Sequence, residues 1–469
     1  MKRSKSTKTI EFTVGSPFIS ILRFALPVIG GNLFQLFYTL ADSVIVGQTL
    51  GAESLAAVGA TSIIVYFVLC FIQGITNGFG ICLGQKCGAK DEKGMKKCIA
   101  ATAVLSIGFT IIITALFCGF SHPILRVMKT PQDIYKEAYI YMFIILLGSG
   151  ATFFYNAISN ILRALGDSEI PLFCLIFSSI LNIVLDIVFI VPMKSGIAGA
   201  AWATVLSQFV SAILCTVAGV KKFRELHLSK QDFEGIKPYA SQLVKVGFPM
   251  GFQMSVMCIG QLSMQSAVNS LGSQAIAGYT AATKADQISV LVNNAMSSTL
   301  SAYVSQNYGA RNQLRISQGV RAALVQTEVL NIVMCVGILL LRNVIVEMFI
   351  ANPGAEIRYY SNGYLYWIAP SYVLLGILTI YRCAIQSMQN TVAPFFACFI
   401  ELVMRIGSTM LICSMFGYIG VCVATPLAWL GACVCLVPVY YIQIRSMTDN
   451  SSTHFRCKTT GKRDRIQKK

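Results

Sequence analysis

The sequence contains few charged side chains for its length. Aspartate, glutamate, lysine and arginine make up 12% of its 469 residues, whereas a soluble domain carries roughly 25%. The mean hydropathy is +0.66. So little charge over this length excludes a large soluble domain and predicts a polytopic membrane protein.

Histidine and catalytic motifs are scarce as well. The only histidines are His122, His227 and His454, and all three lie in predicted loops or in the C-terminal tail. No HExxH, P-loop or GxSxG motif occurs, and the 16 cysteines show no metal-ligand spacing. The sequence therefore argues against an enzyme, against direct ATP drive and against a cofactor, and the cysteines are interpreted as small packing residues.

Long apolar runs are what the sequence has in abundance. A membrane-spanning helix needs about 20 apolar residues, and continuous rather than alternating runs favour helices over a barrel. The sequence predicts an all-α membrane protein with twelve transmembrane helices, at roughly 17–41, 55–81, 97–120, 134–160, 169–192, 197–220, 240–270, 276–303, 317–341, 358–386, 391–415 and 419–443.

The net charge of +17 follows the predicted topology. With the N-terminus inside, most lysines and arginines fall in inner loops and tails, among them Arg163 between the fourth and fifth spans. This positive-inside pattern predicts that both termini are cytoplasmic. The basic excess therefore requires no nucleic acid as a partner. The basic C-terminal tail, 444–469, is either solvated or lies on anionic membrane lipid.

Two halves of the sequence repeat at an offset of about 221–223 residues. Each half holds six predicted spans, an even number, so both halves enter the membrane from the same side and are related by a two-fold axis along the membrane normal. Such parallel repeats are typical of transporters whose substrate lies between two bundles. Matched landmarks of the repeat are Pro27 and Pro249, Gly51 and Gly272, and Gln85 and Gln306.

The repeat divides the chain into two pseudo-symmetric six-helix lobes. The predicted domains are an N-terminal cytoplasmic tail, an N-lobe, a cytoplasmic linker and a C-lobe, at 1–16, 17–220, 221–239 and 240–443. Pro27 and Pro249 each remove a helix hydrogen bond and are either hinges or plain bends. Because one chain contains both lobes, we expect a monomer.

Two acidic residues lie inside apolar spans of the N-terminal half. Asp42 is in the first span and Asp186 in the fifth. A carboxylate in hydrocarbon is costly, so an acid kept there is by default a functional-site hypothesis; the alternative is a hydrogen-bonded acid that fixes helix packing. Neither acid has a counterpart in the other half, which favours function. Such a group can carry a proton across the membrane, or it can bind Na⁺ together with amide and hydroxyl oxygens.

Other polar residues share helix faces with these acids. Gln35 and Tyr38 precede Asp42 on one face of the first span, and Asn182 precedes Asp186 by one turn. A six-helix bundle could turn all of them toward one pocket. Other polar residues of the first half that could face the same pocket are Asn156, Asn160, Ser179 and Thr204.

The C-terminal half carries a different polar set. Lys284 and Asp286 lie in the eighth span, where they either pack against neighbours or line a cavity. Met257 and Gln261 belong to a methionine- and glutamine-rich face of the seventh span. Methionine is flexible and polarizable, so this face suits either promiscuous binding or ordinary helix packing.

Taken together, these segments resemble the multidrug and toxic compound extrusion (MATE) transporters. The resemblance covers about 15–445. The presence of acids in the first and fifth spans resembles the pattern of the DinF-like bacterial branch. The segments that carry it are LPVIGGNLFQLFYTLADSVIVGQTLGAESLAAVG, GQKCGAKD, FYNAISNILRALGDSEIP, LNIVLDIVFI and GIAGAAWAT.

The resemblance implies a secondary active antiporter of the bacterial inner membrane. Such a protein exports organic cations or other small amphipathic drugs from a cavity between its lobes, in exchange for H⁺ or Na⁺. The family's bend in the first helix maps to Pro27, and the family acid of the seventh helix has no match, because Gln261 and Gln265 lie in that region. The implied ion-coupling site consists of Tyr38, Asp42, Asn182, Asp186 and Thr204, and the last four would be the Na⁺ ligands.

Two rival functions stay open. A flippase for a lipid-linked saccharide would want a larger and more basic cavity for pyrophosphate, and the few basic residues inside spans, Lys284 and Arg405, argue against it. Arg405 is moreover predicted to be neutralised by Glu401 at i, i+4. A membrane enzyme lacks a catalytic cluster here, and a receptor would not need a tandem repeat.

Overall fold

A computed structural model describes residues 9–128, 130–350 and 353–466, with the side chains of 40, 43, 52, 55, 414 and 448–466 left out. The described chain is almost entirely helical. The first half contains α1 (Pro17–Leu50), α2 (Ala52–Gly88), α3 (Glu92–Gly119), α4 (Ser121–Val127), α5 (Tyr135–Leu147), α6 (Ser149–Ala164), α7 (Glu169–Ile190) and α8 (Gly196–Lys222). Two short 3₁₀ turns, η1 (Arg224–Leu226) and η2 (Lys230–Phe233), then precede α9 (Lys237–Asn269), α10 (Ser273–Gly309), α11 (Gln313–Phe349), α12 (Ala355–Ile368), α13 (Tyr372–Ser387), α14 (Val392–Phe416) and α15 (Tyr418–Ile466).

Each of the twelve predicted spans coincides with one helix or one bent pair. Within the described residues, nine helices are long and apolar enough to cross a membrane, and the pairs α5–α6 and α12–α13, bent by 40° and 47°, would add two more. The remaining span lies in α10, which has 37 residues, like its counterpart α2. Polar residues such as Asn293 and Asn294 lower the hydropathy of α10.

The sequence repeat is also a repeat of backbone conformation. The turns between the first two helices of each half contain Gly51 and Gly272, whose φ angles of 91° and 98° are readily adopted only by glycine. The third helix of each half begins with a matched cap, because Asp91 and Asn312 each accept a hydrogen bond from a backbone N–H three residues on. The two halves are therefore equivalent folds and not merely similar sequences.

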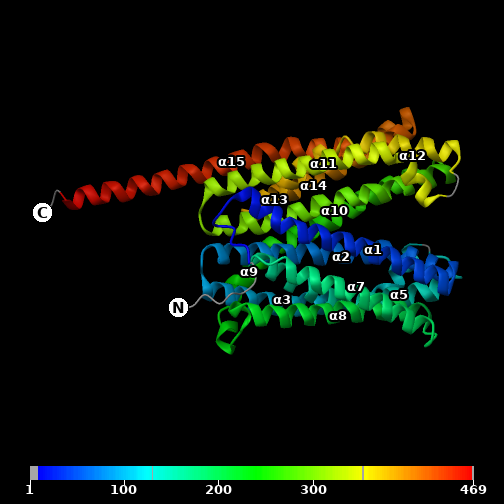
Figure 1. Ribbon diagram of the computed structural model, residues 1–469, viewed down its shortest axis with the longest axis horizontal. Helices are drawn as coiled ribbons and strands as arrows, with labels where there is room; N and C mark the ends of the chain where they lie inside the picture. The colour runs from blue at the N-terminus through cyan, green and yellow to red at the C-terminus, as the bar shows by residue number, and fades with distance from the viewer. Residues whose placement is uncertain (1–8, 129, 351–352, 467–469) are drawn as a thin grey trace.

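Helices of the two halves form two bundles that lie side by side, with both labelled termini at the same end of the molecule (Figure 1). The first helix of each half crosses between them. Phe24 and Val28 of α1 are buried in the apolar core of the second half, whereas Leu243 and Val246 of α9 are buried in that of the first half. Farther along α1, Val46 packs against α7 and α8 of its own half.

The lobes are joined at the end that carries the termini by two matched glutamines, which we call the glutamine latch. The Nε2 of Gln85 on α2 donates to the carbonyl oxygen of Ser387 at 2.9 Å. The Nε2 of Gln306 on α10 donates to that of Ala164 at 2.8 Å. Since Gln85 and Gln306 are matched in the repeat, each lobe binds the other in the same way.

Two matched glycines make the latch possible. A Cβ atom on Gly88 would lie 1.7 Å from the carbonyl oxygen of Gln306, and one on Gly309 would lie 1.9 Å from that of Gln85. Neither position has room for a side chain while the latch is closed. At this end, α2 and α10 therefore approach each other backbone to backbone.

The last residues of the predicted N-terminal tail are packed between the lobes. The N–H of Ile10 donates to the carbonyl oxygen of Gly166 in the first half, at 3.0 Å. Phe12 is fully buried, and its N–H donates to Gln306 Oε1 at 3.2 Å. Arg315 Nη2 donates to the carbonyl oxygen of Phe12 at 2.9 Å. Residues 9–16 thus form a strap, while residues 1–8 lie outside the described chain.

Candidate functional site

The two predicted acids meet in the first half. Asp186 on α7 is fully buried, Asp42 on α1 is half-buried, and the two helices pack directly against each other. The two carboxyl groups are neighbours that interact with each other. The structure therefore brings together residues that are far apart in the sequence and places them inside the bundle.

Three other predicted members of the site surround the acid pair. Asn182 precedes Asp186 by one turn of α7 and is 1% exposed. Its Nδ2 donates to Oγ1 of Thr204 on α8, at 3.5 Å. Tyr38, one turn before Asp42, lies close to both carboxyl groups. All five predicted ion-coupling residues are therefore neighbours in space.

Two further side chains border the acid pair. Tyr141 of α5 lies near both acids and Tyr38, and Gln208 of α8 meets the hydroxyl group of Tyr38. Gln208 could be found from the sequence because it lies one turn after Thr204. Tyr141 was not predicted, although it follows Glu137 by four residues on α5, a spacing that places two polar residues on one face of a helix.

The acid pair offers oxygen atoms that lack hydrogen-bond donors. In the described structure, Oδ1 of Asp42, both carboxyl oxygens of Asp186 and Oδ1 of Asn182 are buried without a hydrogen-bond partner. Leaving such atoms unpaired is costly. A proton shared between the carboxyl groups, or a Na⁺ ion bound to these oxygens, would supply the missing interaction. The described residues contain no group of three or more His, Cys, Asp or Glu that could hold a metal ion.

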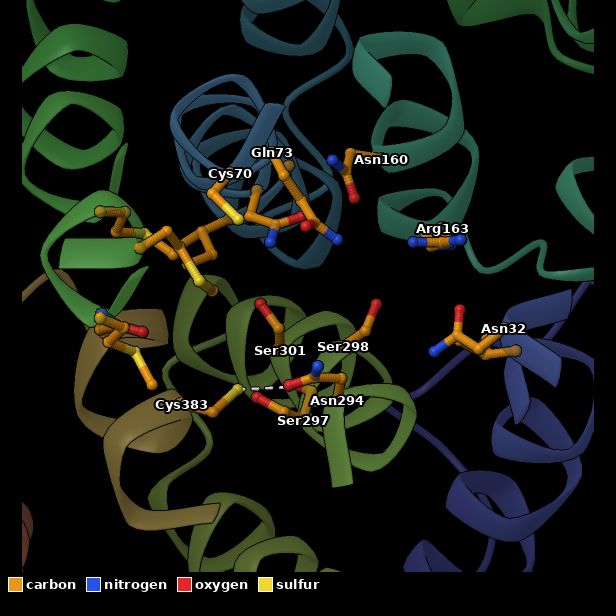
Figure 2. Close-up of a pocket in the computed structure, with 18 of the residues that line it drawn as sticks. Asn32, Cys70, Gln73, Asn160, Arg163, Asn294, Ser297, Ser298, Ser301 and Cys383 are labelled. Carbon is orange, nitrogen blue, oxygen red and sulfur yellow. Dashed lines mark hydrogen bonds between the residues drawn. The ribbon is translucent and has the colours of Figure 1, made fainter. Parts of the chain in front are cut away.

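A separate pocket of about 220 Å³ lies between the two lobes. Figure 2 shows side chains of both lobes pointing into it. It is lined by α1, α2 and α6 of the first half and by α9, α10 and α13 of the second. Three of the predicted cavity residues, Asn160, Met257 and Gln261, line it. A molecule bound here would touch both lobes at once.

The other predicted cavity residues lie elsewhere. Gln35 is exposed on α1, and Lys284 is half-buried on α10. Ser179 and Asn156 donate hydrogen bonds to carbonyl oxygens of their own helices, at 2.8 and 2.9 Å. Asp286 accepts a hydrogen bond from the hydroxyl group of Tyr364 at 3.4 Å. None of the five lines the pocket between the lobes.

Arg163 was missed as a pocket residue. The sequence assigned it to an inner loop, and this assignment is wrong, because α6 continues to Ala164 and Arg163 lines the pocket. A hydropathy pattern tends to end a span at a charged residue. The signal that could have found it is the spacing, since Asn156, Asn160 and Arg163 follow one another at i, i+4 and i+7.

The predicted pair of Glu401 and Arg405 is confirmed and belongs to a larger group. Glu401 Oε1 lies 3.1 Å from Arg405 Nη2, and Glu401 Oε2 lies 2.7 Å from Arg382 Nη2. All three residues are buried. The glutamate is thus fully engaged by two arginines, unlike the acid pair of the first half.

Each of the two candidate hinge prolines lies within a helix that crosses into the opposite lobe. Pro27 is inside α1 and Pro249 is inside α9. Each lies within the stretch of its helix that packs in the opposite lobe, since Val28 and Met250, the residues that follow the prolines, are buried there. Neither can donate a backbone hydrogen bond, so each helix is weakened there. Their role as hinges stays a prediction.

Comparisons with known proteins agree with this architecture. The sequence model of the MatE family matches residues 27–188 and 249–411, once in each half. The chain is 34% identical over 370 residues to the probable multidrug resistance protein YpnP of Bacillus subtilis, an alignment that covers 79% of this chain and 82% of that protein. It is 22% identical over 374 residues to the FAD transporter of Shewanella oneidensis, with coverages of 79% and 82%.

Solved structures support the fold independently. One described as the outward-facing conformation of a multidrug resistance MATE family transporter of the MOP superfamily superposes with a TM-score of 0.88. The sequence identity is 23%, and the superposition covers 95% of this chain and 100% of the other. The two-lobe architecture is therefore shared with proteins of distant sequence.

Proposed function

Because the chain belongs to the MatE family of multidrug transporters, we propose that it is a secondary active antiporter that exports small amphipathic or cationic compounds in exchange for H⁺ or Na⁺. It is a multi-pass membrane protein. The proposal also places it in the bacterial inner membrane as a monomer, with both termini in the cytoplasm, in keeping with the basic inner loops.

The observation that supports ion coupling is the acid pair of Asp42 and Asp186 with its unpaired oxygens. A cation that enters the pair replaces an unfavourable contact between two carboxylates by a favourable one. Transfer of one charge across the membrane potential supplies about 2.3 kcal/mol per 100 mV. Binding at this pair is therefore a means by which an ion gradient can change the conformation of the first lobe.

Helix α1 connects the acid pair to the lobe interface. Its outer part carries Asp42 against α7, whereas its first turns, from Ile21 to Val28, pack in the core of the opposite lobe. It also lines the pocket through Val28 and Asn32. Ion binding that shifts α1 against α7 would thus act on the pocket and on the contact between the lobes at once.

In this proposal the structure represents the state closed to the cytoplasm. The glutamine latch and the strap of residues 9–16 hold the lobes together at the end that carries the termini. Export would alternate this state with one in which the latch is broken and the pocket opens to the cytoplasm. Each transition would be a rocking of one lobe against the other.

A flippase for a lipid-linked saccharide is the second candidate. The pocket has one cationic side chain, Arg163, on its wall, which is less basic than a pyrophosphate site would want. A further relative is named an FAD transporter, so the cargo of this chain need not be a drug.

Substitution of Asp42 by Asn tests the ion coupling. Asparagine keeps the size of the side chain and removes its charge, so the protein should fold normally and lose gradient-driven efflux. The measurement is dye export from proteoliposomes with a proton gradient or a Na⁺ gradient imposed separately, which also identifies the coupling ion. Asp133→Asn, at an exposed loop position, is the matched control. Wild-type efflux in Asp42→Asn vesicles would remove the acid pair from the mechanism.

A further inference from the structure

The pocket between the lobes has one charged side chain on its wall. Of its 24 lining residues in the described structure, Arg163 is the single residue that is charged at neutral pH, and none is acidic. The remainder are amides, hydroxyls, thiols, methionines and small apolar residues. The acid pair of the first half is not part of this wall. The pocket therefore presents a positive charge to whatever binds there.

Arg163 has no acidic partner. The described structure contains no ion pair that includes it, and its Nε is buried without a hydrogen-bond acceptor. The titratable side chains that interact with it are Tyr155 and Cys215, which are ordinarily uncharged. Asp167, four residues on, is bound to Lys222 and to backbone N–H groups of α7. Arg163 is half-buried, and withdrawing a cation from water without giving it a partner is costly.

The repeat supplies a comparison that separates packing from function. The counterpart of Arg163 in the second half is Gln386, which lies at the same place on α13 and also lines the pocket. Gln386 is neutral and donates from Nε2 to Oε1 of Gln253 at 2.6 Å. The fold thus accommodates a neutral amide with an internal partner at this position. The fold therefore does not need a cation at this position, because the second half has a neutral residue there.

We propose that the cargo carries an oxyanion, a carboxylate or a phosphate, which binds to Arg163 while the apolar body of the cargo packs on the methionines of α9. The guanidinium group presents a planar set of donors that matches either oxyanion. Asn32 and Asn160 bring further amide groups to the same pocket (Figure 2). Met250, Met254 and Met257 of α9 line the same pocket and offer it a flexible apolar surface.

The size of the pocket fits this division of roles. At about 220 Å³, it is smaller than the 300–1,000 Å³ typical of sites for drug-sized ligands. In the closed state it holds an oxyanion and the adjoining part of a molecule. Because the wall carries one cation and no acid, an anionic or zwitterionic amphiphile fits it better than a purely cationic one. This inference rests on the proposed transport function and adds the charge of the cargo to it.

The experiment measures equilibrium binding to the purified full-length protein in detergent, without any gradient. The first probe pair is a zwitterionic rhodamine with a free carboxylate and its methyl ester, which lacks the anion. The second is flavin mononucleotide and riboflavin, which differ by a phosphate group. Preference for the anionic member within the rhodamine pair indicates a carboxylate, and within the flavin pair a phosphate.

Variants at Arg163 decide the result. We expect wild-type protein to bind the anionic member of at least one pair about tenfold more tightly or better, because charge-assisted hydrogen bonds exceed the free energy of a tenfold step. Arg163→Gln, which copies the residue of the second half, should abolish the preference. Arg163→Lys should restore part of it. Arg321→Gln, on an exposed face of α11, is the matched control and should bind as wild type.

Three outcomes would overturn the proposal. They are binding of none of the four probes, equal or tighter binding of the uncharged or cationic members, and an anion preference that survives in Arg163→Gln. Thermal melting of each variant in detergent verifies that it is folded, and the Lys variant keeps the test valid if the Gln variant is not. Since no gradient is used, a failure of ion-coupled efflux leaves this readout unaffected.

Discussion

At the residue scale, the acids inside this bundle differ in how completely they are paired. Glu401 has an arginine on each carboxyl oxygen, whereas Asp42 and Asp186 have each other and several oxygens without donors. A fully paired acid is expected to hold helices together, and an unpaired one is available to a mobile cation. We therefore expect pairing, and not burial alone, to separate acids that only stabilise the bundle from acids that could bind a coupling ion.

This distinction predicts opposite effects of removing a charge. Glu401→Gln leaves Arg382 and Arg405 buried without their counter-ion, and breaking such a group costs about 3–5 kcal/mol. Asp186→Asn removes a repulsion and should leave stability unchanged or raised while efflux is lost. Melting temperatures in detergent, measured beside transport, test both expectations.

A compensated variant is the control for Glu401. Replacing Arg382, Glu401 and Arg405 together by methionines removes all the charges, and such replacements are often neutral or stabilising. The triple variant should therefore melt near the wild type. If Glu401→Gln melts like the wild type as well, the cluster does not hold the second lobe together.

At the element scale, the helix ends of α2 and α10 act as a matched pair. Gly88 and Gly309 let the two backbones touch, and Gln85 and Gln306 then reach across. A side chain at either glycine would collide with a carbonyl group, so the contact can form only while both positions are glycine. This property suits a gate with two states.

A leucine at Gly309 should hold the gate open. The Cβ atom alone would lie 1.9 Å from the carbonyl oxygen of Gln85, so Gly309→Leu should shift the protein toward the state open at the end that carries the termini. Spin labels on the α2–α3 and α10–α11 loops would report a longer distance. Gly108→Leu, at a glycine with open space around it, is the matched control. Unchanged spin-label distances in Gly309→Leu would show that this contact is not the gate.

At the scale of the whole molecule, the lobes are interlocked by their first helices. The beginning of α1 is buried with the second half and that of α9 with the first. Each half therefore lacks part of its core without the other. The linker between η1 and α9 carries little of this packing, since its 3₁₀ turn η2 contains no buried residue.

A chain cut within the linker tests the interlock. Two fragments, 1–233 and 234–469, should copurify when expressed together. Helix α1 completes the apolar core of the second half, and α9 completes that of the first. Either fragment alone should aggregate in mild detergent. Size-exclusion chromatography distinguishes these outcomes, and a monodisperse single fragment would contradict the interlock.

Much of this architecture could be predicted from the sequence, because apolar runs fix the spans and the repeat fixes their symmetry. The acid pair could also be predicted, since Asp42 and Asp186 are exceptions within apolar helices. The crossing of α1 and α9 could not, because it depends on contacts between distant segments. Arg163 was missed because hydropathy places charged residues outside spans, and Tyr141 because its partners lie on other helices.

Helix α10 has a consequence for how the protein is made. It is as long as α2, yet it is not among the helices of the described chain that are apolar enough to enter lipid by themselves. We therefore expect it to enter the membrane together with a companion helix that covers its polar face. Its neighbour α11, which it contacts directly, emerges later, so insertion of the second lobe has to wait for that helix. Insertion of this half is thus expected to be cooperative and not to proceed one helix at a time.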